Sequence, residues 1–148
     1  MRRLLLLFLL FPYASVAEEG ASLDEYFGKT NVIIVATAPA CYNIVVYVAA
    51  NFDQRRRGLM FVRDLPSMTG MLFIYDSDDY LSMWMKNTFI PLDMLFIRSD
   101  GTIANIETDT EPQSLKSVAA VEPVRFVLEL NAGETETLGI DTDSYLLL

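Results

Sequence analysis

The chain has 148 residues, a formal net charge of −9, one Cys and no His. Without His, a Ser-His-Asp triad, a Cys-His dyad and His-ligated zinc or haem are excluded, and a single Cys cannot form an internal disulfide. The acidic balance argues against nucleic acid and against an anionic membrane surface as partners.

The first residues, 1–17, have the pattern of a secretory signal peptide. Arg2 and Arg3 give a basic start, residues 4–11 are an unbroken apolar run, and small residues precede a cut after Ala17. The run is too short for a transmembrane helix, which needs about 20 apolar residues. We expect cleavage after Ala17, a periplasmic or secreted protein, and no stable membrane insertion afterwards. An N-terminal anchor that stays uncleaved is the alternative.

The rest of the chain divides into a leader and one domain. Residues 18–30 are polar and irregular and predict a flexible leader, which leaves 31–148 as a single β domain. Runs rich in β-branched residues predict strands at 32–36 and 44–49.

The next segments predict one helix and further strands. Residues 52–58 suit one or two helical turns that carry three consecutive arginines and stop at Gly58. Apolar residues at 71–75 predict a strand buried on both faces. A polar turn at 76–80 and an extended segment at 81–85 are expected to follow.

A hairpin is expected around Ser99-Asp100-Gly101. Residues 93–98 and 102–107 flank this turn, and an Asp-Gly pair supplies the positive φ angles that a tight turn needs.

The C-terminal part predicts two more strands. Residues 108–121 form a long polar stretch, and 124–130 alternate so that Glu129 shares one face with Arg125 and Val127. One helical turn is expected within 131–139. The apolar end, 145–148, predicts a closing strand. The fold class is therefore mainly β, a compact sandwich or partly closed barrel of about seven short strands with one or two short helices.

The segment 83–93 is the densest in side chains that suit recognition. Its Trp84 is the only Trp of the chain, and an indole can stack on a sugar or another flat ligand. Lysine, amide, hydroxyl and carboxylate groups nearby can fix a ligand by hydrogen bonds. The structural alternative is that Trp84 packs in the core, Lys86 pairs with Asp93, and Asn87 begins a capped bend.

Short motifs in this segment and around it occur in a characteristic order. They are Arg57-Gly58-Leu59-Met60, Gly70-Met71-Leu72-Phe73, Trp84-Met85-Lys86-Asn87-Thr88, Pro91-Leu92-Asp93, Asp100-Gly101 and Val127-Leu128-Glu129-Leu130-Asn131-Ala132-Gly133. Together they resemble the bacterial and archaeal family called domain of unknown function 192, over roughly residues 43–148. The resemblance implies a compact, mostly β domain that is often exported, and it brings no established activity. The chain has Thr142-Asp143 where the family usually has a Gly-Asp turn.

The clustering of scarce polar residues and their place in the motifs lead to one functional hypothesis. The protein is expected to be a small-ligand or glycan binding module with a shallow polar pocket beside Trp84. The predicted ligand-binding residues are Trp84, Lys86, Asn87, Thr88, Asp93, Arg57 and Glu129. No catalytic residue, cofactor or metal is predicted.

Three other functions remain open. The apolar segment 145–148 could be a sheet edge that meets a structural partner in the cell envelope. A His-free enzyme would have to use Lys86 or a carboxylate pair such as Asp93 and Glu129. The thioethers suit Cu(I), although core filling is the commoner role of Met. The candidates for Cu(I) are Met60, Met68, Met71, Met83, Met85 and Met94.

Other polar features receive structural interpretations. The acidic groups at 76–79 and 141–143 lack the Gly and distal Glu of an EF-hand and predict solvated turns. Arg55, Arg56 and Arg57 predict a charged face, with an anion site as the alternative. Cys41 is expected to be a small buried side chain, and a disulfide between two chains in an oxidising compartment is the alternative.

Overall fold

The computed structural model describes residues 22–37 and 40–148, so the predicted signal peptide lies outside the described residues. The strands are β1 (Gly28–Ala36), β2 (Ala40–Ala49), β3 (Thr69–Asp79), β4 (Ser82–Met83), β5 (Leu92–Ile97), β6 (Ile103–Glu107), β7 (Val118–Ala119), β8 (Val124–Asn131) and β9 (Tyr145–Leu147), and the helices are α1 (Leu23–Tyr26), α2 (Phe52–Arg57) and α3 (Glu134–Leu138). This mainly β architecture confirms the predicted fold class.

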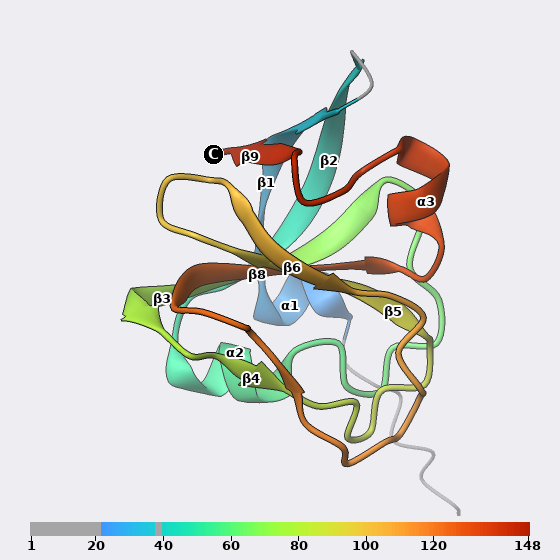
Figure 1. Ribbon diagram of the computed structural model, residues 1–148. Coiled ribbons are helices and arrows are strands. Elements are labelled where there is room, and N and C mark those ends of the chain that lie inside the picture. The colour runs from blue at the N-terminus through green and yellow to red at the C-terminus, as the bar shows by residue number, and fades with distance from the viewer. Residues whose placement is uncertain (1–21, 38–39) are drawn as a thin grey trace, which may run out of the picture.

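One curled sheet organises the molecule. Its strands follow the order β6-β5-β8-β3-β2-β1-β9, and β4 pairs with β7 in a separate two-stranded ribbon. Neighbours in the large sheet are antiparallel except β2 and β3, which run parallel. A parallel pair needs a crossover connection, and here the segment between β2 and β3 carries α2. Figure 1 shows the sheet curling into a half-barrel.

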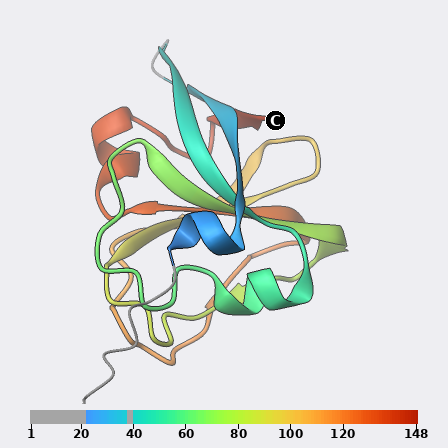
Figure 2. The ribbon, with the colours of Figure 1, turned by 180° about the vertical axis from the view of Figure 1, so that it is seen from behind.

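The two faces of the sheet bury separate hydrophobic clusters, because successive side chains of a strand point to opposite faces. Figure 2 shows α1 and α2 on one side of the sheet and α3 on the other. We call these sides the α2 face and the α3 face. On the α2 face, Met71, Phe73 and Met94 are buried, whereas Leu72 and Leu128 belong to the cluster on the α3 face.

Most of the predicted elements are present, with some changes of length. The strand expected at 71–75 is β3, whose centre is buried on both faces as predicted. The polar turn expected at 76–80 is wrong, because β3 continues through Asp79. The pairing of Asp79 with Val124 of β8 and an ion pair at 2.7 Å between Asp78 and Arg125 keep this polar end extended.

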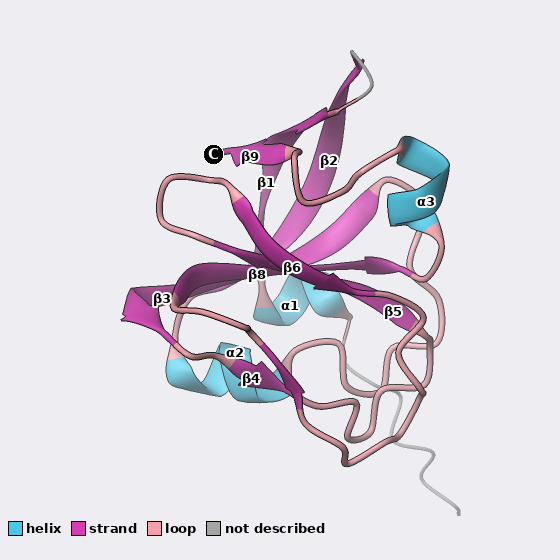
Figure 3. Cartoon of the chain, in the orientation of Figure 1, coloured by secondary structure: helices cyan, strands magenta, loops and turns pink. Residues whose placement is uncertain are grey.

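Other differences concern short elements, which Figure 3 distinguishes by colour. Within 81–85 only Ser82–Met83 forms a strand, and its partner β7 lies in the stretch 108–121 that we expected to be irregular. Residues 22–30, part of the predicted leader, hold α1 and the start of β1, and Phe27 is buried there. No helix among the described residues is both long enough and apolar enough to cross a membrane.

The predicted hairpin joins β5 to β6, but its turn differs from the expected one. Only Gly101 of the Asp-Gly pair has a positive φ, 90°, and its N–H donates to the Arg98 carbonyl at 3.0 Å. The Gly101 carbonyl accepts a hydrogen bond from Leu146 N–H at 2.8 Å, and Thr102 forms an isolated bridge with Tyr145. The two edges of the half-barrel therefore touch at this turn.

Candidate functional site

The arginines predicted as a charged face lie on α2. Asn51 caps this helix, because its side chain accepts a hydrogen bond from Gln54 N–H at 2.9 Å while Gln54 Oε1 accepts one from Asn51 N–H. Arg55 then donates to the carbonyls of Ala50, at 2.6 Å, and Ile74, at 2.8 Å. These bonds fix the C-terminal end of α2 against the sheet on the α2 face.

The segment after β4 presents Trp84 and Lys86 to solvent on either side of a buried Met85. Trp84 is 49% exposed and Met85 only 1%. The Met85 N–H donates to the Ser114 carbonyl at 3.1 Å, which helps to hold the segment in place. The Lys86 ammonium lies 5.0 Å from the centroid of the Trp84 ring, a cation–π distance. Trp84 therefore does not fill the core, and Lys86 does not pair with Asp93.

A cavity of about 100 Å³ lies between this segment, α2 and the sheet. Five predicted site residues line it: Arg57, Trp84, Lys86, Thr88 and Glu129. The further lining residues were not among the predicted ligand-binding residues, although Arg55 and Arg56 belong to the alternative anion site. They are Arg55, Arg56, Gly58, Leu59, Met60, Phe73, Tyr75, Ser82 and Met83. A larger groove of about 860 Å³ adjoins this cavity, and Asn87 lines the groove. The residues common to both are Arg56, Arg57, Met60, Trp84 and Lys86.

Glu129 is the charged group that β8 places at the cavity. It pairs with Met71 and Met94 on the neighbouring strands, so its side chain lies on the α2 face among buried residues. The side chain is buried, and burial raises the pKa of its carboxyl to about 8. Among the described residues, no ion pair within 4.0 Å and no hydrogen bond to the carboxyl opposes this effect.

Two further groups give the cavity its electrostatic character. Burial raises the pKa of the Tyr75 hydroxyl, the positive charge of Arg55 lowers it, and the charge of Glu129 raises it. The Arg57 guanidinium lies 5.1 Å from the ring centroid of Tyr26 and 5.0 Å from that of Phe61. Its Nε is buried and has no hydrogen-bond partner in the described part of the chain.

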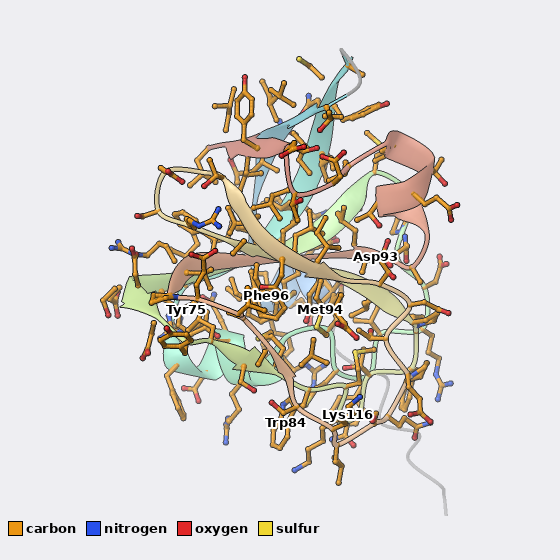
Figure 4. All side chains as sticks on the ribbon, in the orientation of Figure 1. Tyr75, Trp84, Asp93, Met94, Phe96 and Lys116 are labelled. Atoms are coloured by element: carbon orange, nitrogen blue, oxygen red, sulfur yellow. The ribbon has the colours of Figure 1, made fainter. Side chains whose placement is uncertain are left out.

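Asp93 is the predicted site residue that the structure places elsewhere. It is fully buried on the α3 face, opposite Leu130. One carboxylate oxygen accepts from Asp109 N–H at 3.0 Å, and the other from Gly133 N–H, Thr135 N–H and the Thr135 hydroxyl at 2.6–3.1 Å. In Figure 4, Asp93 lies near α3 and far from Trp84. Asp93 therefore fastens α3 to the sheet.

The separation of Asp93 from Glu129 also removes one enzymatic alternative. Asp93 is adjacent to Met94, the partner of Glu129 on β5, and neighbouring residues of a strand point to opposite faces. The two carboxyl groups thus lie on opposite sides of the sheet. They cannot flank one substrate bond, as the two acids of a glycosidase must.

The structure also shows where Cys41 and three of the methionines considered for Cu(I) lie. Cys41 is exposed at the start of β2, so its expected burial is wrong. Met71, Met85 and Met94 are buried in the core of the α2 face, as core-filling side chains are. The Met85 thioether lies 3.2 Å from the Thr110 hydroxyl, which is also 2.9 Å from the Leu92 carbonyl.

Comparison with known proteins places the chain in a family. The model of DUF192, described as an uncharacterized ACR, matches residues 33–148. A solved structure from Sinorhizobium meliloti 1021, proposed to be a transcription regulator, is 40% identical with a TM-score of 0.80, covering 82% of this chain and 94% of that one. A protein of unknown function from Novosphingobium aromaticivorans DSM 12444 is 28% identical with a TM-score of 0.78, covering 81% and 85%.

A search of curated proteins found no match. The family model covers most of the chain, and both solved structures share its fold over most of their own length. The chain therefore belongs to the DUF192 family.

Proposed function

We propose that the protein is a binding module for a small polar ligand, which enters the cavity beside Trp84. The single observation that carries this proposal is the buried Glu129 carboxyl, which faces a cavity and lacks a partner among the described residues. No hydrogen bond within the described part of the chain occupies this carboxyl, so it can bond a ligand that enters the cavity. One such bond contributes about 0.5–1.5 kcal/mol to affinity.

The surroundings of the cavity support the same function. Trp84 and Lys86 stand exposed at its rim, and the adjoining groove has room for the larger part of a ligand. An exposed indole is a stacking platform for a planar ring or a sugar face. Asp93 is left out of the proposed site because its hydrogen bonds are made within the fold.

A ligand-observed NMR screen of monosaccharides, sugar acids and sugar phosphates tests this function. We expect a bound compound to lose affinity at least about tenfold in Trp84→Ala. Tyr145→Ala is the matched control, because Tyr145 is an exposed aromatic residue of β9 on the other side of the molecule. Equal binding to Trp84→Ala and the wild type, or no binding by any compound, would contradict the proposal.

An assembly role is the second candidate, and the exposed apolar side chains at β9 favour it. The side chain of Leu147 is 47% exposed, and that of its cross-strand partner Ile33 on β1 is 43% exposed. The residue that precedes Leu147, Leu146, is buried, so deleting the C-terminal strand would also disturb folding. Leu147→Lys is the sharper test: a folded variant that loses a self-association or envelope partner supports this role.

Export is part of the proposal as well. The signal-peptide pattern of residues 1–17 supports it. N-terminal sequencing of the protein recovered from a periplasmic fraction should start at Glu18. Recovery only from the cytoplasm, with Met1 or Arg2 first, would contradict export.

A further inference from the structure

The charges around the cavity indicate which chemical class of ligand binds there, and this inference rests on the proposed function. Among the described lining residues the cationic ones are Arg55, Arg56, Arg57 and Lys86, and the acidic one is Glu129. The whole chain has a net charge of −9, so the excess of positive charge at this cavity is opposite in sign to the net charge. A surface of this kind raises the local concentration of anions.

These cations differ in how far they are already engaged. Arg55 uses its Nη1 on two carbonyls, and Arg56 pairs with Asp53 at 3.3 Å. Arg57 has a buried Nε without a partner in the described part of the chain, and Lys86 is held over the Trp84 ring. Arg57 and Lys86 are therefore the cations available to a ligand.

Besides the cations Arg57 and Lys86, the cavity contains Glu129, which can act as a hydrogen-bond donor. The charged and titratable groups that share its cavity are the three arginines of α2, Tyr75 of β3 and Lys86 of the segment after β4. Because burial raises its pKa to about 8, the carboxyl is mainly protonated near neutral pH. A protonated carboxyl donates one hydrogen bond and adds no negative charge.

We propose that the ligand carries an oxyanion, a carboxylate or a phosphoryl group, which lies in the cavity between Glu129 and Arg57 and accepts a hydrogen bond from each. The cavity volume of about 100 Å³ is large enough for such a group. The body of the ligand lies in the adjoining groove, along Trp84 and Lys86.

This arrangement also predicts that binding takes up protons. Near pH 8 the Glu129 carboxyl of the free protein is partly ionised. An anion beside it disfavours ionisation, so the carboxyl takes a proton from the buffer as the ligand binds. No covalent bond forms or breaks in this step.

Calorimetric titration with inorganic phosphate, glucose 6-phosphate, glucuronate and glucose tests the proposal. The anionic sugars should bind at least about tenfold more tightly than glucose. Comparing the affinities of glucose 6-phosphate and glucuronate decides between a phosphoryl and a carboxylate group. Inorganic phosphate tests whether the phosphoryl group binds without a sugar. Titrations near pH 8 in two buffers of different ionisation enthalpy should show proton uptake in the wild type and none in Glu129→Gln.

The Arg57 Nε–H resonance in a nitrogen-15 spectrum reports on the same contact and should shift with the anionic probes. Arg57→Gln should lose the preference for anions. Arg63→Gln is the matched control, since Arg63 is an exposed arginine stacked on Phe89 outside the cavity lining. If glucose binds as tightly as the anions, the proposal that the ligand carries an oxyanion is refuted. The proposed binding function is not affected by that result. Failure of every anion to shift the Arg57 signal also refutes the oxyanion proposal, and the Trp84 screen then decides the proposed function separately.

Discussion

Replacing Glu129 by glutamine should change how the stability of the protein depends on pH. The folded state raises the pKa of Glu129 from an ordinary value of 4.5 to about 8. The unfolded chain therefore releases a proton that the folded protein keeps. This difference makes unfolding more favourable as the pH rises from about 4.5 to about 8. A glutamine side chain cannot titrate, so the variant escapes this loss.

The size of the effect follows from the pKa difference. Each pKa unit corresponds to about 1.4 kcal/mol. Between about pH 5 and pH 7, the wild type should lose roughly 2–3 kcal/mol relative to Glu129→Gln. Below about pH 4.5 the two proteins should differ little in this respect, because Glu129 is then protonated in both states.

Urea unfolding at several pH values measures this difference through the free energy of unfolding of each protein. Glu111→Gln removes an exposed carboxyl from outside the cavity and serves as the control for the lost charge. Parallel pH profiles of the wild type and Glu129→Gln would refute the reasoning. They would mean that the folded protein solvates or pairs the Glu129 carboxyl.

Three further substitutions test the structural assignments. Asp93→Ala should destabilise the fold by about 3 kcal/mol or more, because three backbone N–H groups and one hydroxyl lose their acceptor; an unchanged melting temperature would contradict its role at α3. Gly70→Ala should cost about 2 kcal/mol or more in urea unfolding, since its Cβ would lie 2.5 Å from the Glu129 carbonyl oxygen. Trp84→Ala should change the unfolding free energy by less than about 1 kcal/mol, as expected for a half-exposed side chain; a larger loss would assign Trp84 to the core.

Local patterns predicted a substantial part of the fold and of the site. The strand at 71–75 and the short helix at 52–58 have sequence signals that the structure confirms. Trp84 and Lys86 stand out in the sequence because scarce polar and aromatic types cluster around them. The structure brings both to the rim of one cavity.

Long-range pairing explains what local patterns missed. The groups that bind the Asp93 carboxylate lie 16 to 42 residues away in the chain, so no nearby residue revealed its structural role. Tyr75 lies at the cavity where the pairing of β3 with β8 becomes irregular, and its sequence neighbours give no sign of this. Its position at the end of the apolar run was the one signal that the sequence contained.

The most direct test of the account is the titration of the Glu129 side-chain carboxyl itself. Carbon-13 NMR of the free protein, with the Glu129 signal assigned by comparison with Glu129→Gln, follows the ionisation of this one group. If the carboxyl is buried and has no partner in the free protein, it should titrate with a midpoint near 8. A midpoint near the ordinary 4.5 would contradict the account, because the carboxyl would then be already solvated or paired.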